Sequence, residues 1–307
     1  MPLEAEVGMS ADDTRFDPAG WTHDYATTNG VRLHYVTQGE GPLVVLLHGF
    51  PEHWYSWRYQ IAPLADAGFR VVAPDMRGYN LSDKPRGGYD IKNLTRDVRG
   101  LIRAMGETSA TVVGHDWGGV IALQFPIDYP AACDRLIVMN APLVRSWYWG
   151  RRNYPNNTYA LLMQVPGLAE RRNWSDIDAT AKAVFSGAAA NNDSFTDEDI
   201  EILAEALKQP RALSSAMKYY RSIYWPDWFL TWPDRNERIK CPTQFIWGRE
   251  DPAVRLPFME EAAERVDDLQ TVLIDDAGHW VQQEKPQEVT SAMLDFLAPS
   301  AGEASAQ

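Results

Sequence analysis

The sequence predicts an α/β protein with a mostly parallel central sheet, helices on both faces and an inserted helical segment. Short, unbroken apolar runs alternate with stretches of helical spacing, and such runs fit strands that are covered on both faces. The alternation stops near Asn140 and resumes near Cys241. The segment between them holds helical patterns, six of the twelve tryptophans and no convincing strand. Strands separated by helices in this way are typical of parallel sheets.

The expected elements follow one another in a simple order. A hairpin comes first, because two strand-like runs, 22–27 and 31–38, flank the turn pair Asn29-Gly30. Further strands are expected at the apolar runs 43–47, 70–73, 110–113, 136–139, 243–247 and 271–274. Helices are expected at 57–67, 91–105, 120–127, 258–266 and 286–297. We therefore divide the chain into an α/β core of residues 1–142 and 239–298, a helical cap of residues 143–238 and a disordered tail of residues 299–307.

Composition and charge exclude several classes of function. The 307 residues carry 29 Lys and Arg against 42 Asp and Glu, which gives a formal net charge of −13. Phosphate binding needs a surplus of basic side chains, so nucleic acid is not an expected partner. No run of about 18 apolar residues occurs, and the N-terminus lacks a basic segment followed by an apolar one. We expect no membrane span, no secretory signal and a cytoplasmic location.

The cysteines and histidines predict neither a disulfide framework nor a metal site. Cys133 and Cys241 are far apart in the chain and form no metal-like or redox-like motif, which favours a reducing compartment. The six histidines show no ligand-like spacing with Cys, Asp or Glu. We therefore expect no metal and no cofactor.

The segment Gly114-His115-Asp116-Trp117-Gly118 has the form G-x-nucleophile-x-G. It follows the expected strand 110–113 and opens a helix, and its glycines permit a strained turn that lifts one side chain above the sheet edge. That side chain is Asp116. An aspartate that merely caps the helix is the alternative interpretation. It is disfavoured because an acid and a histidine follow in the expected chain order.

The acid and the base are expected on loops at the carboxyl ends of two later strands. His279 follows the run 271–274 and is the expected general base, and Asp251 follows the run 243–247 and is expected to orient it. Glu250 competes with Asp251, since a shift of one residue in the loop would exchange them. We favour Asp251.

The oxyanion hole is expected from two backbone amides. His48-Gly49-Phe50-Pro51 follows the strand 43–47, where this architecture places its oxyanion loop. The N–H groups of Phe50 and Trp117 would be the two donors.

An aspartate nucleophile indicates displacement at a saturated carbon rather than acyl transfer. A serine would leave an ether that a histidine-activated water cannot readily cleave, whereas a carboxylate leaves an ester. Water can then attack the carbonyl of Asp116 itself. His279 is needed for this second step and not for the first, because a carboxylate is ionised at neutral pH without help. This pattern argues against an esterase, a lipase or a peptidase.

Together these motifs resemble the α/β-hydrolase-fold epoxide hydrolases and their haloalkane dehalogenase relatives. The resemblance extends from about Trp21 to Leu297. It implies the α/β-hydrolase fold and an Asp-His-Asp triad, which both activities share. It is carried by His48-Gly49-Phe50-Pro51-Glu52-His53-Trp54, Asp75-Met76-Arg77-Gly78-Tyr79 with Ser82-Asp83, Gly114-His115-Asp116-Trp117-Gly118-Gly119, Gly248-Arg249-Glu250-Asp251 and Gly278-His279-Trp280.

Two cap tyrosines favour the epoxide activity. In the epoxide hydrolases one tyrosine stands upstream of a Gln-x-Pro-Gly sequence and another directly before an Arg. Tyr159 and Tyr220 match these positions, and the resemblance implies that they polarise and protonate the epoxide oxygen. Tyr219 is adjacent to Tyr220, but neighbouring helical residues point about 100° apart, so only one should reach the pocket.

A haloalkane or haloacid dehalogenase is the first alternative. Several haloalkane dehalogenases carry Asn where this chain has Phe50, which has no side-chain donor. Trp117 occupies the place where fluoroacetate dehalogenases tend to have Arg, so a small carboxylate is less expected. The indole N–H of Trp117 still keeps a halide site open, with a second donor from Trp147, Trp149, Trp174, Trp225 or Trp228. A non-catalytic ligand-binding member of the fold is the second alternative, and the intact triad argues against it.

We therefore expect a cofactor-independent epoxide hydrolase that converts a small apolar epoxide to a vicinal diol. The sequence does not fix the oligomeric state, and a homodimer stays open. The expected substrate-binding residues are Phe50, Trp117, Met163, Val165 and Trp280.

Overall fold

A central sheet organises the chain. The structure is a computed structural model, and it describes residues 20–143, 163–165, 167–172, 174–222 and 237–298. In these residues eight strands form one sheet in the order β1-β2-β4-β3-β5-β6-β7-β8. The strands are β1 Thr22–Thr28, β2 Val31–Gln38, β3 Leu43–Leu47, β4 Arg70–Pro74, β5 Ala110–His115, β6 Cys133–Met139, β7 Thr243–Gly248 and β8 Leu269–Ile274.

The sheet is parallel from β4 onward and antiparallel at its β1 and β2 edge. β3 and β5 are buried at every position, as the unbroken apolar runs predicted. The first hairpin turns at Asn29 and Gly30, which have φ values of 47° and 74°. Positive φ at both turn residues suits the twist of paired strands and explains the Asn-Gly pair.

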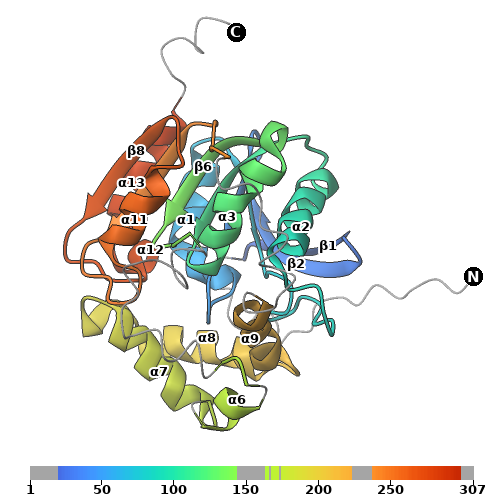
Figure 1. Ribbon diagram of the computed structural model, residues 1–307, viewed down its shortest axis with the longest axis vertical. Helices are drawn as coiled ribbons and strands as arrows, with labels where there is room; N and C mark the ends of the chain where they lie inside the picture. The colour runs from blue at the N-terminus through green and yellow to red at the C-terminus, as the bar shows by residue number, and fades with distance from the viewer. Residues whose placement is uncertain (1–19, 144–162, 166, 173, 223–236, 299–307) are drawn as a thin grey trace, which may run out of the picture.

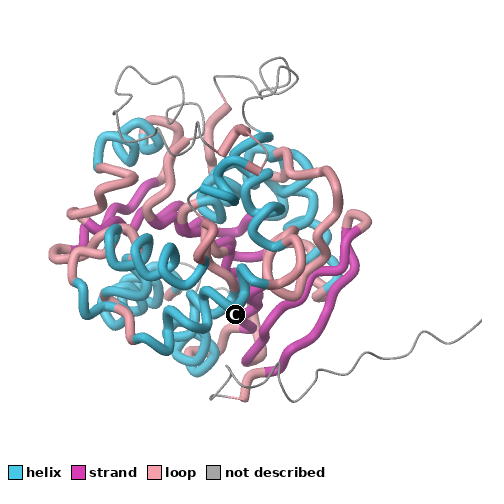
Figure 2. Tube along the Cα trace, turned by 90° about the horizontal axis from the view of Figure 1, so that it is seen from below, coloured by secondary structure: helices cyan, strands magenta, loops and turns pink. Residues whose placement is uncertain are grey.

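Helices cover both faces of the sheet, so the predicted fold class is confirmed. Side chains of α2, α3 and α11 contribute to one apolar cluster, and those of α1, α12 and α13 contribute to another. Figure 2 shows the strands running between these helices. The helices of the core are α1 Arg58–Asp66, α2 Ile91–Ala104, α3 Trp117–Asp128, α11 Leu256–Ala263, α12 Val281–Glu284 and α13 Pro286–Leu297, with short 3₁₀ helices η1 Trp54–Trp57 and η2 Pro130–Ala132.

Some boundaries differ from the expected ones for identifiable reasons. α3 begins at Trp117 rather than at 120. The apolar helical pattern starts only after Gly118 and Gly119, whereas the first helical turn already follows Asp116. β6 begins at Cys133 rather than at 136, because its first residues include the polar pair Asp134 and Arg135. An apolar run marks only the covered part of a strand, so it misses such an end.

In the part of the chain between β6 and β7 that the structure describes, four helices lie beyond the carboxyl ends of the parallel strands. They are α6 Leu168–Arg172, α7 Ile177–Ala188, α8 Asp197–Lys208 and α9 Ala212–Ser222, with a 3₁₀ turn η4 Asn192–Ser194. Figure 1 shows them gathered at the end of the sheet toward which the arrows of β6 and β8 point. α8 starts with a capping box, in which Thr196 and Asp199 satisfy each other's backbone amides. Asp199 also forms a buried ion pair with Arg58 at 2.9 Å, which joins α8 to α1.

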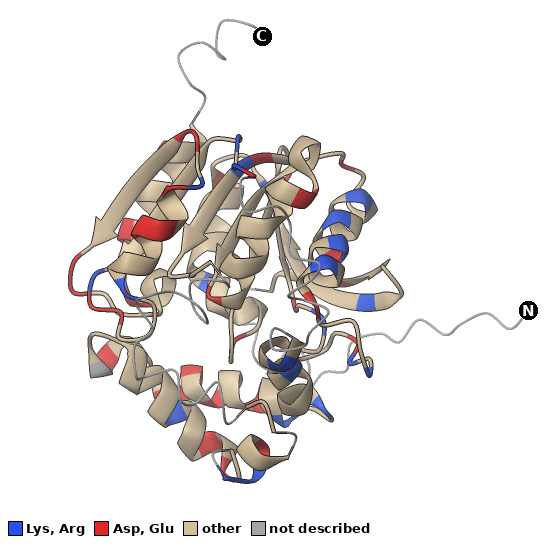
Figure 3. Cartoon of the chain, viewed as in Figure 1, with Lys and Arg blue, Asp and Glu red and all other residues tan. Residues whose placement is uncertain are grey.

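Charge is unevenly distributed over this fold. Basic residues follow the outer side of α2 at spacings of three and four, at positions 92, 96, 99 and 103 (Figure 3). The buried side of the same helix carries Leu94, Val98 and Leu101. This amphipathic pattern accounts for the helix, and its basic side is a solvated surface.

The structure corrects one inference about the cysteines. Cys133 and Cys241 are 108 residues apart in the chain, yet their sulfurs are 3.8 Å apart because β6 and β7 are neighbours in the sheet. Both are free thiols.

Among the described residues, no group of three or more His, Cys, Asp or Glu side chains could hold a metal ion, and no helix is long and apolar enough to cross a membrane.

Candidate active site

Asp116 occupies a strained turn between β5 and α3. Its φ of 50° and ψ of −118° are rare for a residue with a side chain, and such conformations persist where the surroundings enforce them. Glycines allow the close packing that this turn needs. A Cβ on Gly118 would lie 2.1 Å from the carbonyl oxygen of Leu47, and one on Gly49 would lie 2.5 Å from Cβ of Asp116. The local sequence therefore presents the Asp116 carboxylate at the carboxyl end of the sheet.

His279 lies between two carboxylates. Its Nδ1 is 2.8 Å from Oδ2 of Asp251, and its Nε2 is 3.6 Å from Oδ2 of Asp116. Burial acts to lower the pKa of His279, but the charges of Asp251 and Asp116 outweigh it and raise this pKa well above its usual value. Burial acts to raise the pKa of Asp116, but its contact with His279 and the charge there outweigh it and lower this pKa. The structure thus brings the three expected triad residues together.

Asp251, and not Glu250, contacts the histidine. The buried Asp251 carboxylate accepts hydrogen bonds at Oδ1 from the backbone amides of Ala253 and Val254, at 2.7 and 2.8 Å. Its Oδ2 faces His279. Glu250 is exposed, and its side chain accepts a hydrogen bond from the backbone amide of Ala277 at 3.1 Å. The two acids are adjacent in the loop, and the backbone amides of Ala253 and Val254 fix Asp251 as the one that faces His279.

Asn140 is a residue of the site that sequence reasoning missed. It follows β6, and its side-chain amide donates to Oδ2 of Asp251 at 2.6 Å. Its Oδ1 accepts from the backbone amide of Gly248 at 3.1 Å. Asn140 is fully buried and has a φ of 43°. A polar residue at the carboxyl end of an apolar strand was the available signal, since open α/β sheets place their functional side chains there.

The two oxygens of Asp116 have different neighbours. Oδ1 accepts a hydrogen bond from the backbone amide of Phe50 at 2.8 Å, whereas Oδ2 faces His279. Trp117 is the first residue of α3, and amides in the first helical turn have no acceptor within the helix. The backbone amides of Phe50 and Trp117 are therefore suited to hold an oxyanion at the position of Oδ1.

The buried carboxylate of Glu52 connects the loops of the site. Glu52 was part of a sequence motif, but the motif did not predict this role. Oε2 of Glu52 accepts from the backbone amide of Gly49 at 2.9 Å and lies 2.8 Å from Nδ1 of His115. The other ring nitrogen of His115 lies 2.8 Å from the carbonyl oxygen of His279. Burial acts to raise the pKa of Glu52, but His115 outweighs it and lowers this pKa. Gln282 and Gln283 donate to Oε1, so the carboxylate is satisfied at both oxygens.

The adjacent tyrosines of α9 point in different directions. The ring of Tyr220 is buried, with its centroid 5.4 Å from that of Phe50 and 5.0 Å from that of Trp117. The hydroxyl of Tyr219 instead donates to the carbonyl oxygen of Arg77 at 2.8 Å and anchors α9 to the core. Both rings lie near Trp117, since the centroid of Tyr219 is 5.5 Å from it, but Tyr220 also contacts Phe50 of the oxyanion loop and its hydroxyl is not the one bonded to Arg77. Tyr159 lies outside the described residues.

Three of the five expected lining residues belong to the same large apolar cluster. Phe50, Trp117 and Met163 are buried in one apolar cluster, which Trp174 also joins with its ring 5.6 Å from that of Phe50. The sequence interpretation did not place Trp174 in the apolar lining, although it named this residue among the halide donors. The other tryptophans named with it, 147, 149, 225 and 228, lie outside the described residues.

The surroundings of Val165 and Trp280 differ from those of the other three expected lining residues. Val165 is 51% exposed. Trp280 is fully buried in the opposite apolar cluster, where its indole N–H donates to the carbonyl oxygen of Phe185 at 3.0 Å. Its position next to His279 in the chain suggested a lining role, but this hydrogen bond directs its ring toward α7.

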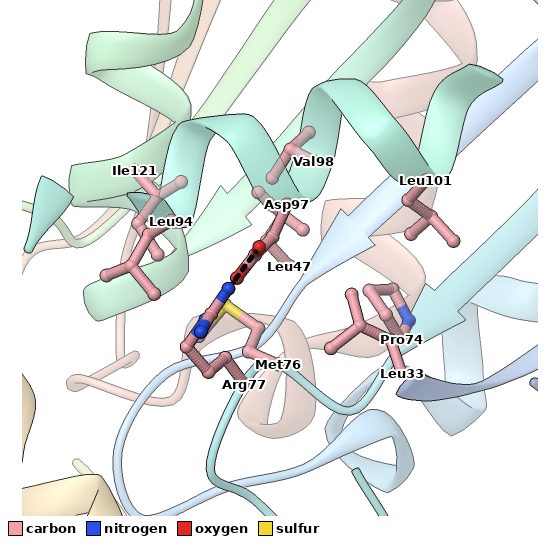
Figure 4. A pocket seen from close by; sticks show the side chains of 10 residues that line it. All are labelled: Leu33, Leu47, Pro74, Met76, Arg77, Leu94, Asp97, Val98, Leu101 and Ile121. Carbon is pink, nitrogen blue, oxygen red and sulfur yellow. Dashed lines mark hydrogen bonds and ion pairs between the residues drawn. The ribbon is translucent and has the colours of Figure 1, made fainter. Parts of the chain in front are cut away.

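A small cavity lies elsewhere in the core. It measures about 20 Å³, enough for one water molecule, and lies among side chains of β2, β3, α2 and α3. Figure 4 shows Arg77 and Asp97 pointing toward each other along its wall, where they form two hydrogen bonds of 2.6 and 2.7 Å. No triad residue lines this cavity, so we assign it to core packing.

Comparisons with known proteins identify the family of this chain. The α/β hydrolase fold family matches residues 42–286. Epoxide hydrolase A of Mycobacterium tuberculosis is 36% identical over 90% of this chain and 97% of its own, and the AB hydrolase superfamily protein YfhM of Bacillus subtilis is 37% identical over 89% and 96%. The crystal structure of epoxide hydrolase A from Mycobacterium thermoresistibile, 34% identical, superposes with a TM-score of 0.80 over 90% of this chain and 98% of that one. The chain therefore belongs to the α/β hydrolase fold family, among its epoxide hydrolases.

Proposed function

We propose that the protein hydrolyses an epoxide to a vicinal diol through a covalent ester on Asp116. The observation that carries this proposal is the arrangement of the Asp116 carboxylate, with Oδ1 on the amide of Phe50 and Oδ2 toward His279. A carboxylate held in this way has one oxygen free to attack carbon and another already placed in an oxyanion hole. The epoxide hydrolases among its relatives support the choice of substrate class.

In the first step, Oδ2 of Asp116 attacks an epoxide carbon and the carbon–oxygen bond of the ring breaks. The low pKa of Asp116 keeps the carboxylate ionised without a base. The leaving oxygen is an alkoxide and needs a proton, which a tyrosine hydroxyl can donate. We assign this role to Tyr220, whose ring contacts both Phe50 and Trp117, and to Tyr159 by its match to the family pattern.

In the second step, His279 activates water for attack on the ester carbonyl of Asp116. Esterification removes the negative charge of Asp116, which is one of the two charges that raise the pKa of His279. The pKa of His279 then falls, and the ring releases its Nε2 proton, which restores the hydroxyl of the tyrosine that protonated the alkoxide. The free Nε2 can then accept a proton from water. The charge that develops on Oδ1 is stabilised by the amides of Phe50 and Trp117, and Asp251 stabilises the histidinium.

The helices between β6 and β7 would act as the cap, and we propose residues 143–238 as its extent. Phe50, Trp117, Met163 and Trp174 supply an apolar surface near Asp116, which fits a small apolar epoxide. A cytoplasmic location is part of the same proposal, because the two free thiols fit a reducing compartment.

Two experiments test this function. Purified protein assayed with styrene oxide and with 1-bromobutane should form diol and release no bromide. A single turnover in heavy-oxygen water should then place label in the peptide that contains Asp116. Asp116→Ala should abolish turnover and retain ligand binding, while Glu250→Gln serves as the control. Bromide without diol would indicate a dehalogenase, and label found only in the diol would exclude the ester.

A further inference from the structure

Two thiols meet at the amino ends of neighbouring parallel strands. Cys133 is the first residue of β6, and Cys241 lies two residues before β7. The ladder between these strands pairs Leu136 with Thr243, so the two cysteines are offset by one residue. Their sulfurs are 3.8 Å apart. The described structure gives neither thiol a role in the triad or in the cap.

The backbone geometry suits a bond between the two sulfurs. Neighbouring strands are about 4.8 Å apart and each residue advances about 3.3 Å, so an offset of one residue places the two Cα atoms about 6 Å apart. Disulfides join Cα atoms separated by about 4.4 to 6.8 Å. The sulfurs need to approach by roughly 1.8 Å to reach bonding distance. Cys241 lies in a bend before its strand, where a small adjustment does not disturb the ladder.

The two thiols also differ in the way that disulfide chemistry requires. Cys133 is 5% exposed, whereas Cys241 is partly exposed. Their contact lowers the pKa of the Cys241 thiol, while the same contact and burial raise the pKa of the Cys133 thiol. Cys241 is therefore the more exposed sulfur and the one that ionises more readily, and Cys133 is the thiol behind it.

We propose that Cys133 and Cys241 form a reversible disulfide when the protein meets hydrogen peroxide. The Cys241 thiolate attacks one peroxide oxygen, the O–O bond breaks, and a sulfenic acid and hydroxide form. The sulfur of Cys133 then attacks the sulfur of Cys241 and displaces its hydroxide, which takes up the proton of Cys133. The two sulfurs lose two electrons, the peroxide gains them, and the two hydroxides leave as water once the first has taken up a solvent proton.

This bond would join the two strands between which the cap helices are inserted. It would close a loop of 108 residues that starts in β6 and ends just before β7. Cross-linking so long a loop restricts the unfolded chain, and we expect the thermal unfolding midpoint to rise by roughly 5 to 10 °C. The pair lies at the amino ends of the strands, whereas Asp116, Asp251 and His279 follow their carboxyl ends. Turnover of an epoxide should therefore change by less than about twofold.

The test compares the full-length reduced protein before and after a small molar excess of hydrogen peroxide, quenched with catalase. We expect both thiols to disappear and a non-reducing peptide map to show one linked pair whose mass is two hydrogens lower. Dithiothreitol should restore both thiols and the original unfolding midpoint. Cys241→Ser should leave the Cys133 thiol unreacted. Cys133→Ser should leave a sulfenic acid on Cys241 that dimedone captures.

Three outcomes would overturn the proposal. The first is a wild-type protein that keeps both thiols under conditions that oxidise free cysteine. The second is further oxidation of Cys241 to a sulfinic acid with Cys133 intact, and the third is a bond between two copies of the chain. An unfolding midpoint that does not rise on formation of the linked pair would refute its stabilising role.

Discussion

Replacing Asp251 by asparagine should separate the two halves of the proposed reaction. The two backbone amides at Oδ1 require an acceptor, so the new amide oxygen takes that place and its NH₂ group faces His279 and Asn140. Nδ1 of His279 must then accept a hydrogen bond, and its proton moves to Nε2. Nε2 faces Asp116, so the ring loses the lone pair that it needs as a base.

The size of the effect follows from which step needs the histidine. In serine proteases the same exchange lowers turnover by about 10⁴, because the histidine acts there from the first step. Here the ester forms without it, so formation should slow by less than about tenfold. Hydrolysis of the ester should slow by about 10³ to 10⁴, or about 4 to 5.5 kcal/mol of activation free energy. The ester should therefore accumulate.

Rapid quenching followed by intact mass measurement would detect this ester as an increase equal to the mass of the epoxide. Trp117 follows the nucleophile directly, so tryptophan fluorescence should report the same two phases in stopped flow. Glu250→Gln is the matched control, because Glu250 is the adjacent acid and its side chain accepts a hydrogen bond from the backbone amide of Ala277. Accumulation in the control but not in Asp251→Asn would reverse the assignment of the acid. Accumulation in neither, with wild-type turnover in both, would refute the argument from the tautomer.

Three further predictions concern the cap, the core and the surface. In single-turnover kinetics, Tyr220→Phe should slow ester formation by about 10²-fold or more and leave ester hydrolysis unchanged. Tyr219→Phe should mainly lower the free energy of unfolding in urea, by about 1 kcal/mol. Equal kinetic losses in the two variants would contradict their separate roles. Burial lowers the pKa of His53 to about 4, so as the pH falls the unfolded chain binds a proton at this histidine before the folded chain does. The contribution of His53 to the free energy of unfolding is therefore complete above pH 6.5 and should decline by about 3 kcal/mol by pH 4. His53→Gln should remove that part of the slope in urea titrations, and an unchanged slope would show that another group is responsible. Val165→Asp should change the unfolding free energy by less than about 0.5 kcal/mol and leave turnover intact, and a large loss of turnover would restore Val165 to the pocket.

The features that the sequence predicted are those written in consecutive residues. Strands such as β3 and β5 are covered on both faces, and this burial requires an unbroken apolar run. The elbow is also local, because Asp116 can be raised above the sheet only where the surrounding glycines leave room for other backbones. The chain order of nucleophile, acid and base follows from the same strands. These three sources explain why the fold and the positions of Asp116, Asp251 and His279 could be predicted.

Features that depend on contacts between distant segments could not be read in this way. Asn140 bonds to Asp251 because β6 and β7 are neighbours, and Cys133 meets Cys241 for the same reason. An approximate strand order does not specify which side chains meet at a given level of the sheet. The exposure of a side chain in a loop is equally hidden, as it is for Val165, which is 51% exposed.

The buried carboxylate of Glu52 shows why these distant contacts matter for the chemistry. It joins the oxyanion loop through Gly49 to His115 in the elbow strand, and His115 in turn bonds to the backbone of His279. An oxyanion hole is effective only if its donors are held in place before the charge develops. Leaving a buried hydrogen-bonding group without its partner costs about 1 to 3 kcal/mol, so these loops cannot shift independently without a penalty. The motif around Glu52 therefore contributes to catalysis by fixing the relative positions of the amide of Phe50, the carboxylate of Asp116 and the ring of His279.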